Sequence, residues 1–443
     1  MPPRGSDDHR SRLWRRLGAE RTTVCFLSIA TAQSTAIGAW KDIRNTARVP
    51  TDSAEVKAML KIAHLDHTQE RGGAELALAR LIQSDPGWIP QLYLPPSPSS
   101  ENAFSDVPPQ FVTRVGVPQP PGAIGGRGLS QINLLLRVIV QALTIRRRRD
   151  FRNTQIVHAN TSRSALIGWL ATTGSSRSLV IHLRDAVEAE AIGRINARAL
   201  QIVLRNADGV IANSTYTLQT ASKFLKTGAL ARVIPSPVGL EANIVDQKSE
   251  SGVKIIGMLA RIAKWKGHEL LIRAFAEACR GRPIKLQLAG APAFGAEAFL
   301  DSLVELVDEL QIQGQVEFIG HITDIWPTLR SWDVCVHTSL HNEPLGQNVL
   351  QYLAACRPTI AVNSGGPAEW IEHGHTGLLF EMGNQKELTD ALRLLVANDR
   401  LRLELSENLA NERPVPTDSA VRNMCREFFE MLPGGGTTQR TSM

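Results

Sequence analysis

The sequence predicts an α/β protein of two lobes, each a doubly wound parallel sheet covered by helices. From residue 58 onward, short runs rich in β-branched residues alternate with amphipathic segments of helix length, a pattern typical of buried parallel sheets. A chain of 443 residues is too long for one ordinary core. A polar stretch over residues 241–252 separates two such regions and has the composition of an interdomain linker.

The first lobe is expected over residues 58–243. Its predicted strands are LKIAHL, QIVHAN, SLVIHLRD, DGVIANS and ARVIPSP. Residues 95–128 are rich in Pro, Ser and Gly and are too many for an idle connection, so they form either a binding-site loop or a plain surface insertion. A helix is expected over residues 129–149. Its leucines and valines lead into four arginines, which suits either an anionic membrane surface or a solvated helix end.

The second lobe is expected over residues 250–415. Its predicted strands are VKIIGMLAR, IKLQLAGA, QVEFIGH, DVCVHTSL, PTIAVNSGG and TGLLFE. An amphipathic helix follows over residues 416–432, and residues 433–443 have the composition of a disordered tail. Residues 1–57 show no sustained period and are interpreted as an atypical extension, with a targeting arm as the alternative.

Composition argues against a nucleic-acid-binding, a disulfide-rich or a membrane-spanning protein. The net charge of +6 suits an anionic substrate or membrane surface, but the basic residues are scattered and no nucleic-acid-binding motif accompanies them. Five widely spaced cysteines form no disulfide framework, so a reducing, cytoplasmic location is expected. The apolar stretch over residues 24–40 is too polar to span a bilayer, and its resemblance to a signal peptide is weakened by a short apolar run.

Two cations lie at the expected carboxyl edge of the second sheet. Arg261 ends a strand, and Lys266 precedes a helix five residues later. Ligands of open α/β sheets bind at this edge, where a helix N-terminus also favours phosphate. Arg261 and Lys266 therefore fit a diphosphate site, although such residues are also common on surfaces.

A loop and a helix follow about eighty residues later. Glu343 and Gly346 precede the helix, and the N–H groups around Gly346 are expected to face the same edge as the cations. Gln347 and Gln351 share one face of this helix, so both can reach a ligand lying along it. The carboxylate of Glu343 would accept hydrogen bonds from sugar hydroxyls.

These motifs resemble the C-terminal half of glycosyltransferase family 4, the retaining group 1 glycosyltransferases. The resemblance is carried by Arg261 with Lys266, by Glu343-Pro344-Leu345-Gly346 and by NSGGPAEWIEHGHTGLLF. It extends backwards through LDHTQERGGAE, QIVHANTSRSALIGWLA and ADGVIANSTYT, and so covers residues 59–430 in order. It implies the GT-B fold, with an interdomain cleft and a last helix that crosses back to the first lobe; a simple cap on the second lobe is the alternative.

The resemblance also implies roles for single residues. Arg261 and Lys266 would hold the donor diphosphate in place of a metal ion, and Glu343 would hold the donor sugar. The N–H groups of Leu345, Gly346 and Gln347 would contact sugar and phosphate. Gly72 and Gly73 would bring backbone close to the diphosphate or acceptor, and Gly365-Gly366 would form either a pocket-lining or a purely structural turn.

The sequence departs from the family pattern at two places. Gln351 stands where a second glutamate usually binds the ribose hydroxyls, and a neutral hydrogen bond is weaker than a charged one. The family commonly places a histidine near the end of the IHLRD strand, a role open to His182 or Arg184; His182 is otherwise a buried core histidine. His64, His67 and His158 are candidates of second rank.

The expected function is transfer of a sugar from a UDP- or GDP-sugar donor to a glycan, a lipid-linked acceptor or a small molecule, with peripheral contact with the inner face of a membrane. No metal-binding motif is present and no cofactor is expected. A non-catalytic nucleotide-sugar-binding protein of the same fold is one alternative. An NAD-dependent dehydrogenase is another, weakened by the lack of G-x-G-x-x-G after the first strand.

Overall fold

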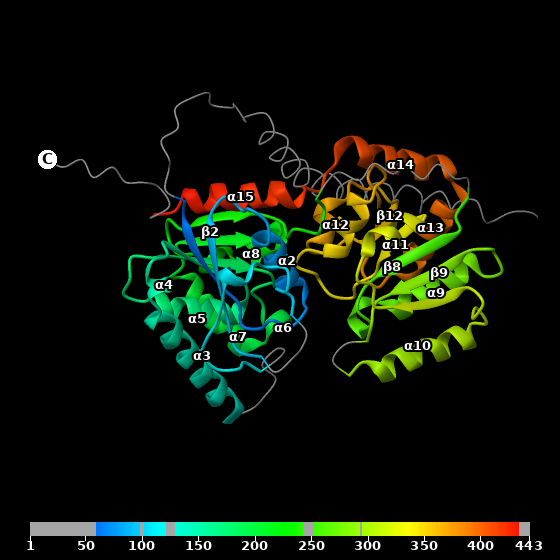
Figure 1. Ribbon diagram of the computed structural model, residues 1–443. Helices are drawn as coiled ribbons and strands as arrows, with labels where there is room; N and C mark the ends of the chain where they lie inside the picture. Colours follow the sequence, from blue (N-terminus) through cyan, green and yellow to red (C-terminus); the bar gives the residue numbers. More distant parts are fainter. Residues whose placement is uncertain (1–58, 98–101, 121–128, 242–251, 293–294, 434–443) are drawn as a thin grey trace, which may run out of the picture. The chain divides into compact units, whose positions relative to one another are not determined.

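The computed structural model describes residues 59–97, 102–120, 129–241, 252–292 and 295–433. These residues form two sheets in which every strand pair is parallel, each sheet covered by helices (Figure 1). The predictions for residues 1–57 and for the tail after Pro433 lie outside the described residues.

The first sheet has the strand order β3-β2-β1-β4-β5-β6-β7. The chain starts in the middle of the sheet at β1, runs outward to β3 and then crosses to the other side at β4. This reversal between β1 and β4 creates the switch point at which doubly wound sheets bind ligands. The strands are β1 (Lys61–Leu65), β2 (Ile89–Leu94), β3 (Val112–Arg114), β4 (Ile156–Ala159), β5 (Ser178–Leu183), β6 (Gly209–Ala212) and β7 (Leu230–Val233).

Helices cover both faces of the first sheet. Apolar side chains of α3, α5 and α7 form the core on one face, and those of α2 and α15 form the core on the other. The helices of this lobe are α2 (Gly73–Ile82), α3 (Leu129–Arg147), α4 (Arg149–Arg152), α5 (Ser162–Thr172), α6 (Ala189–Ile192), α7 (Arg194–Leu204) and α8 (Thr215–Ala221), with the short 3-10 turns η1 (Pro109–Phe111) and η2 (Ser222–Phe224).

The second sheet repeats this winding in the order β10-β9-β8-β11-β12-β13. Its switch point lies between β8 and β11. The strands are β8 (Ile255–Leu259), β9 (Lys285–Ala289), β10 (Val316–Gly320), β11 (Val334–His337), β12 (Thr359–Val362) and β13 (Leu378–Phe380). The helices are α9 (His268–Cys279), α10 (Glu297–Glu309), α11 (Ile325–Ser331), α12 (Gln347–Ala354), α13 (Gln385–Ala397) and α14 (Asp399–Glu412), with the turns η3 (Lys264–Lys266) and η4 (Pro367–Trp370).

The last helix, α15 (Asp418–Glu430), belongs to the core of the first lobe. The hydroxyl of Thr417 caps it by accepting a hydrogen bond from the Ala420 N–H. Phe428 and Phe429 are fully buried in the same cluster as Ile62 of β1. A helix that starts after Thr417 and crosses back is what the resemblance to the family implied (Figure 1).

Two strands of the first lobe were missed in the sequence. β2 carries Pro90, which lacks the N–H that a strand donates to its neighbour, and β3 is only three residues long. Because β3 falls within residues 95–128, that stretch is not the unbroken loop that was expected. Within the described part of the chain, no helix has the length and apolar character needed to cross a membrane.

Candidate active site

Lys266 and Glu343 form a largely buried ion pair at the switch point of the second sheet. Lys266 Nζ donates to Glu343 Oε1 at 2.7 Å, and the two side chains are only 12% and 10% exposed. The ammonium group also lies 4.2 Å from the ring centroid of Trp265, a cation–π distance. The two residues are 77 positions apart in the sequence, and the winding of the sheet brings them together.

The backbone around Lys266 is held by the end of β11. Gly267 has the left-handed φ of 75°, and a Cβ there would lie 2.0 Å from the carbonyl oxygen of Thr338. The Thr338 hydroxyl donates to the carbonyls of Lys266 and Gly267 at 3.0 and 3.1 Å. A glycine at position 267 therefore lets the Lys266 turn pack directly on β11.

Electrostatics keep Glu343 ionised. Burial alone would raise the pKa of this carboxyl, but the neighbouring Lys266 ammonium lowers it below its usual value. His337 Nε2 lies 3.6 Å from Glu343 Oε1. Burial lowers the pKa of His337 to about 4, although Glu343 acts in the opposite direction, so this imidazole is neutral at pH 7. His337 ends β11, within the predicted run DVCVHTSL, but was not singled out as a site residue.

A second turn fixes the loop that carries Glu343. The N–H of Gly366 donates to the Glu343 carbonyl at 2.8 Å. A Cβ at Gly366 would lie 2.2 Å from the carbonyl oxygen of Pro344 and 2.7 Å from Cα of Leu345. The glycine pair therefore forms a turn that sets the backbone of Glu343 to Leu345, as the structural interpretation of the sequence holds, and the pocket-lining role stays a prediction.

Helix α12 begins directly after this loop. Gly346 caps it with the left-handed φ of 70°, Leu345 is buried, and Val349 and Leu350 donate back to the Gly346 carbonyl. The first N–H groups of a helix have no partner within it and carry partial positive charge, which suits an anion. Gln347 starts the helix.

Two further α12 residues, which the sequence did not reveal, hold the end of β8. Asn348 donates from Nδ2 to the Leu259 carbonyl at 3.0 Å, and the Tyr352 hydroxyl accepts from the Leu259 N–H at 2.6 Å. Arg261 follows two residues after this strand and is exposed. The hydrogen bonds therefore fix the position from which the Arg261 side chain extends.

Gln351 lies one turn along α12 from Gln347 and is buried. Its Nε2 donates to the backbone carbonyl of Val238 at 3.3 Å. The amide thus holds the end of the first lobe, because Val238 lies three residues before the predicted linker. This structural role was not evident from the sequence.

A row of polar side chains crosses the carboxyl edge of the first sheet, at its switch point. Asn160, after β4, donates to Asp66 Oδ2, after β1, at 2.7 Å. Arg184, after β5, donates to Asn160 Oδ1 from Nε and Nη2 at 3.1 and 2.8 Å, and from Nη1 to Ser236 at 2.6 Å. Burial lowers the pKa of Arg184 to about 10, so it remains charged. Asp66 and Asn160 were not singled out in the sequence, although each follows a buried strand directly.

His182 lies inside β5, two residues before Arg184 and deeper in the lobe than the polar row. It ends a hydrogen-bonded chain in which Trp88 donates to His64 at 2.9 Å, His64 contacts His158 at 3.0 Å, and His158 contacts His182 at 3.1 Å. Burial lowers the pKa of His64 to about 3 and those of His158 and His182 well below their usual value. His182 is 2% exposed, and its Nε2 has no hydrogen-bond partner among the described residues. His64 and His158 are thus core residues, while His67 is half-buried and bonds to Thr161 at 2.8 Å.

The glycine turn of the first lobe precedes α2. Gly72 caps the helix, and a Cβ there would lie 2.2 Å from Oε2 of Glu75, so the small residue makes room for a buried carboxyl. At Gly73, a Cβ would lie 3.4 Å from Oε1 of Gln347. The Ala74 carbonyl accepts from Asn160 at 3.0 Å, which ties this turn to the polar row.

Glu75 is expected to make the protein less stable as the pH rises. Burial, and then the nearby Asp66 charge, raise its pKa from 4.5 to about 8. Between pH 4.5 and 8 the folded chain keeps a proton that the unfolded chain loses, so the free energy of unfolding falls by up to about 1.4 kcal/mol per pH unit from this group.

Glu75→Gln should reduce this loss of stability with rising pH, as measured by urea titrations at pH 5, 6.5 and 8. Glu305→Gln, an exposed carboxyl on α10, should leave the slope unchanged; a parallel slope in Glu75→Gln would contradict the assignment.

One group of side chains has the composition of a metal site. Asp66, His67 and Glu75 each place a potential ligand atom within 4.8 Å of the others. Asp66 is already bonded to Asn160 and to the His67 N–H, and the raised pKa keeps Glu75 protonated at neutral pH. Metal ligation would require that proton to leave.

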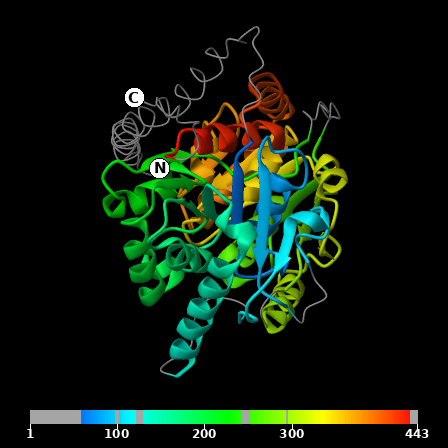
Figure 2. The ribbon, with the colours of Figure 1, turned by 60° about the vertical axis from the view of Figure 1, so that its left-hand side comes forward.

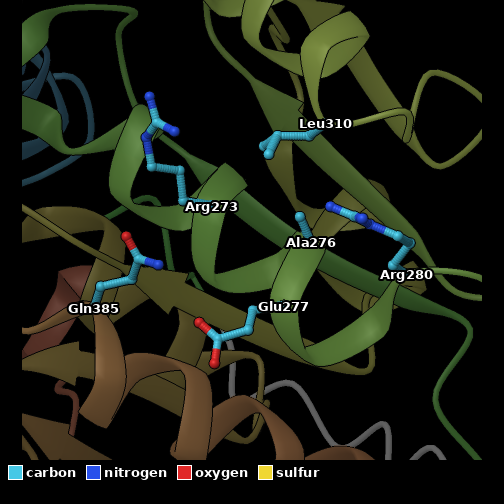
Figure 3. A pocket seen from close by; sticks show the side chains of 6 residues that line it. All are labelled: Arg273, Ala276, Glu277, Arg280, Leu310 and Gln385. Atoms are coloured by element: carbon cyan, nitrogen blue, oxygen red, sulfur yellow. The ribbon is translucent and has the colours of Figure 1, made fainter.

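A surface hollow of about 550 Å³ lies elsewhere on the second lobe, where α9, the end of α10 and α13 meet (Figure 3). Two of its charged residues have partners: Arg273 pairs with Glu269 at 2.8 Å, and Glu277 pairs with Arg393 at 3.2 Å. No predicted site residue lines it.

The site residues of the second lobe fall within one recognised region. Residues 241–412 match the family model for glycosyl transferases group 1. That stretch contains Arg261, Lys266, Glu343 and the whole of α12. It covers the second lobe and not the first, so the match supports the predicted resemblance at the level of the group.

Curated relatives are similar over part of the chain. The lipopolysaccharide core biosynthesis glycosyltransferase LpsE of Rhizobium meliloti is 29% identical over 207 residues, which is 46% of this chain and 58% of the relative. The D-inositol 3-phosphate glycosyltransferase of Corynebacterium jeikeium is 26% identical over 253 residues, 53% of this chain and 60% of the relative. The chain thus matches less than two thirds of the length of each.

Solved structures are similar over both lobes. HepE of Anabaena, solved in complex with UDP, aligns with a TM-score of 0.68 at 23% identity, over 83% of this chain and 99% of that one. Sucrose-phosphate synthase of Thermosynechococcus elongatus aligns with a TM-score of 0.65 at 18% identity, over 84% and 98% of the two chains. Together with the two parallel sheets, these matches show the GT-B fold.

Proposed function

We propose that the protein transfers a sugar from a nucleoside diphosphate sugar to a hydroxyl acceptor. The observation that carries the proposal is the Lys266–Glu343 pair, held at 2.7 Å beside the N-terminus of α12. It combines a cation for a leaving phosphate with a carboxylate for sugar hydroxyls. The matched region of the group 1 glycosyl transferases includes both residues.

In this proposal the protein acts chiefly by neutralising the departing diphosphate. Lys266 and Arg261 supply positive charge, and the backbone N–H groups of Leu345, Gly346 and Gln347 add oriented dipoles. Glu343 accepts hydrogen bonds from the donor sugar. Because its carboxylate stays ionised, it is ready to accept them. Lys266 would then share its hydrogen bonds between Glu343 and the phosphate.

The first lobe would supply the acceptor side. Arg184 is held by Asn160 and Ser236, and His182 offers an Nε2 that lacks a described partner. Gly72 and Gly73 would let backbone approach the substrates. We further propose retention of anomeric configuration, with the leaving phosphate taking the acceptor proton, and no requirement for a metal ion or cofactor.

The names of similar proteins indicate which donors and acceptors to test first. HepE was solved with UDP and with UDP-glucose, so UDP-sugars are the first donors to test, with GDP-sugars second. The relatives named above act in lipopolysaccharide core biosynthesis and on inositol phosphate. We propose an acceptor among cell-envelope glycans, lipid-linked intermediates or small polar molecules, met at the cytoplasmic face of the membrane.

A non-catalytic nucleotide-sugar-binding protein of the same fold is the second candidate. Its support is Gln351, which stands where the family usually has a glutamate and donates its amide to Val238. A donor ribose would then meet only the remaining carbonyl oxygen or the helix backbone. Such a protein would bind the donor without releasing nucleoside diphosphate in the presence of any acceptor.

The experiment is an assay of released UDP or GDP from a panel of nucleotide sugars, with acceptor extracts of a bacterial envelope. We expect release with one donor class, unchanged in rate by EDTA. Binding measured by thermal shift without release would favour the second candidate. A rate that EDTA abolishes and Mg²⁺ restores would refute the metal-independent mechanism.

A further inference from the structure

Helix α3 of the first lobe is apolar on two opposite faces. Its inner face packs into the core through Leu134, Val138, Ala142 and Ile145, all 7% exposed or less. A second row of large apolar side chains points away from the core and is 43–58% exposed: Ile132, Leu135, Leu136, Val140 and Leu143. Their spacing of three, one, four and three residues places them along one side of the helix, which we call the outer stripe.

The charge around the outer stripe has one sign. The sequence of α3 contains no Asp or Glu, and its last turn carries Arg146 and Arg147. Arg149 follows and is exposed, whereas Arg148 is paired with Asp150 at 3.0 Å. An uninterrupted apolar row with arginines at one end complements a surface that is apolar inside and anionic at its boundary.

The outer stripe is at the edge of the lobe. Figures 1 and 2 both show the N-terminal end of α3 extending past the other helices of that layer. The stripe runs over 12 residues from Ile132 to Leu143, and their 11 steps extend about 16.5 Å along the helix axis. Elsewhere in the described chain, exposed leucines such as Leu394 and Leu403 stand on helices whose composition is charged, as on most protein surfaces.

We propose that the outer stripe of α3 docks the protein onto an anionic lipid bilayer. The helix would lie parallel to the membrane plane, with the five apolar side chains among the upper acyl chains and Arg147 and Arg149 at the phosphate groups. The lack of any acidic residue on α3 favours anionic lipid over a protein partner, whose surface would ordinarily present charges of both signs. The proposal does not rest on the transfer reaction, because docking requires no turnover.

The test is cosedimentation of the full chain with vesicles in 0.15 M NaCl. At this ionic strength the Debye length is about 8 Å, so only charges close to the membrane surface contribute. We expect binding to vesicles of phosphatidylcholine with a third phosphatidylglycerol, and weak binding to phosphatidylcholine alone. The double variant Leu135→Ser/Leu136→Ser should bind at least about tenfold less tightly, since it removes apolar area that would enter the bilayer. Arg147→Gln/Arg149→Gln should lose about tenfold as well and become less sensitive to salt.

Leu394→Ser/Leu403→Ser on the second lobe is the matched control and should bind as the unaltered protein does. All variants should retain the unaltered thermal unfolding midpoint, because none of these side chains lies in a core. Equal binding by Leu135→Ser/Leu136→Ser would overturn the proposal. The proposal would also be overturned if the protein failed to bind vesicles and instead formed a concentration-dependent dimer that Leu135→Ser/Leu136→Ser abolishes. The stripe would then bind a second copy of the chain. A failed donor assay would leave the vesicle result unaffected, so the two proposals can fail separately.

Discussion

Lys266→Ala is expected to lower the rate of nucleoside diphosphate release by about 100- to 1,000-fold. Removing one preorganised partner of a developing negative charge typically has an effect of this size. The variant also leaves Glu343 with its charge poorly compensated, because the side chain is 10% exposed and its nearest cation is lost. Initial rates at saturating donor give the effect on turnover.

The matched control is Lys264→Ala, which removes an exposed lysine from the same short turn. It should turn over within about twofold of the unaltered protein, because the charge of an exposed side chain is screened by solvent and contributes little. Equal rates in Lys266→Ala and Lys264→Ala would remove Lys266 from the site.

Stability separates the catalytic role of Lys266 from its structural one. Breaking a buried pair by removing one partner costs about 3 kcal/mol, because the other charge stays buried. Adding Glu343→Gln to Lys266→Ala should therefore recover much of the free energy of unfolding in urea titrations, while turnover stays low. Recovery of turnover together with stability would mean that the pair only supports the fold.

Gly366→Ala is expected to impair donor binding through the backbone of the Glu343 loop. The added methyl would lie 2.2 Å from the Pro344 carbonyl oxygen and 2.7 Å from Leu345 Cα, so the loop must move. The φ of Gly366 is −61°, which alanine adopts without strain, so the effect comes from the contact alone. We expect the KM for the donor to rise at least about tenfold, because small displacements at positioned groups have effects of this order.

Gly314→Ala provides the comparison for this variant. Its glycine lies in an exposed turn, and a Cβ there would have no atom within 4 Å. Its donor KM should match that of the unaltered protein. If Gly366→Ala gave the same KM, the turn would be able to shift without disturbing the donor site.

The strands of the second lobe could be predicted because each is a short apolar run bounded by polar turns. All six predicted runs there are strands, and the five predicted in the first lobe are strands as well. The edge strand β3 could not be found, since a strand of three residues, none of them buried, gives no hydrophobic period. β2 was not predicted because it contains Pro90. Proline has no N–H to donate to a neighbouring strand, so its presence argues against a strand interior.

Single site residues were easier to propose than their partners. Lys266 and Glu343 each belong to a motif, whereas the importance of His337 follows from strand order, which places β11 beside β8. The same holds for Gln351, whose bond to Val238 joins residues 113 positions apart. Polar residues that directly follow buried strands, such as Asp66, are the sequence signal that would have pointed to the row in the first lobe.

The placement of α15 has a consequence for biosynthesis. The face of the first sheet that contains Ile62 and Trp88 is closed by Phe428 and Phe429, which are translated more than 330 residues later. A nascent chain on the ribosome therefore carries an open hydrophobic surface until α15 emerges. Premature termination before residue 418 would release a polypeptide that retains the strands of the second sheet but lacks α15, and its exposed apolar surface would make it a target for chaperones and proteases.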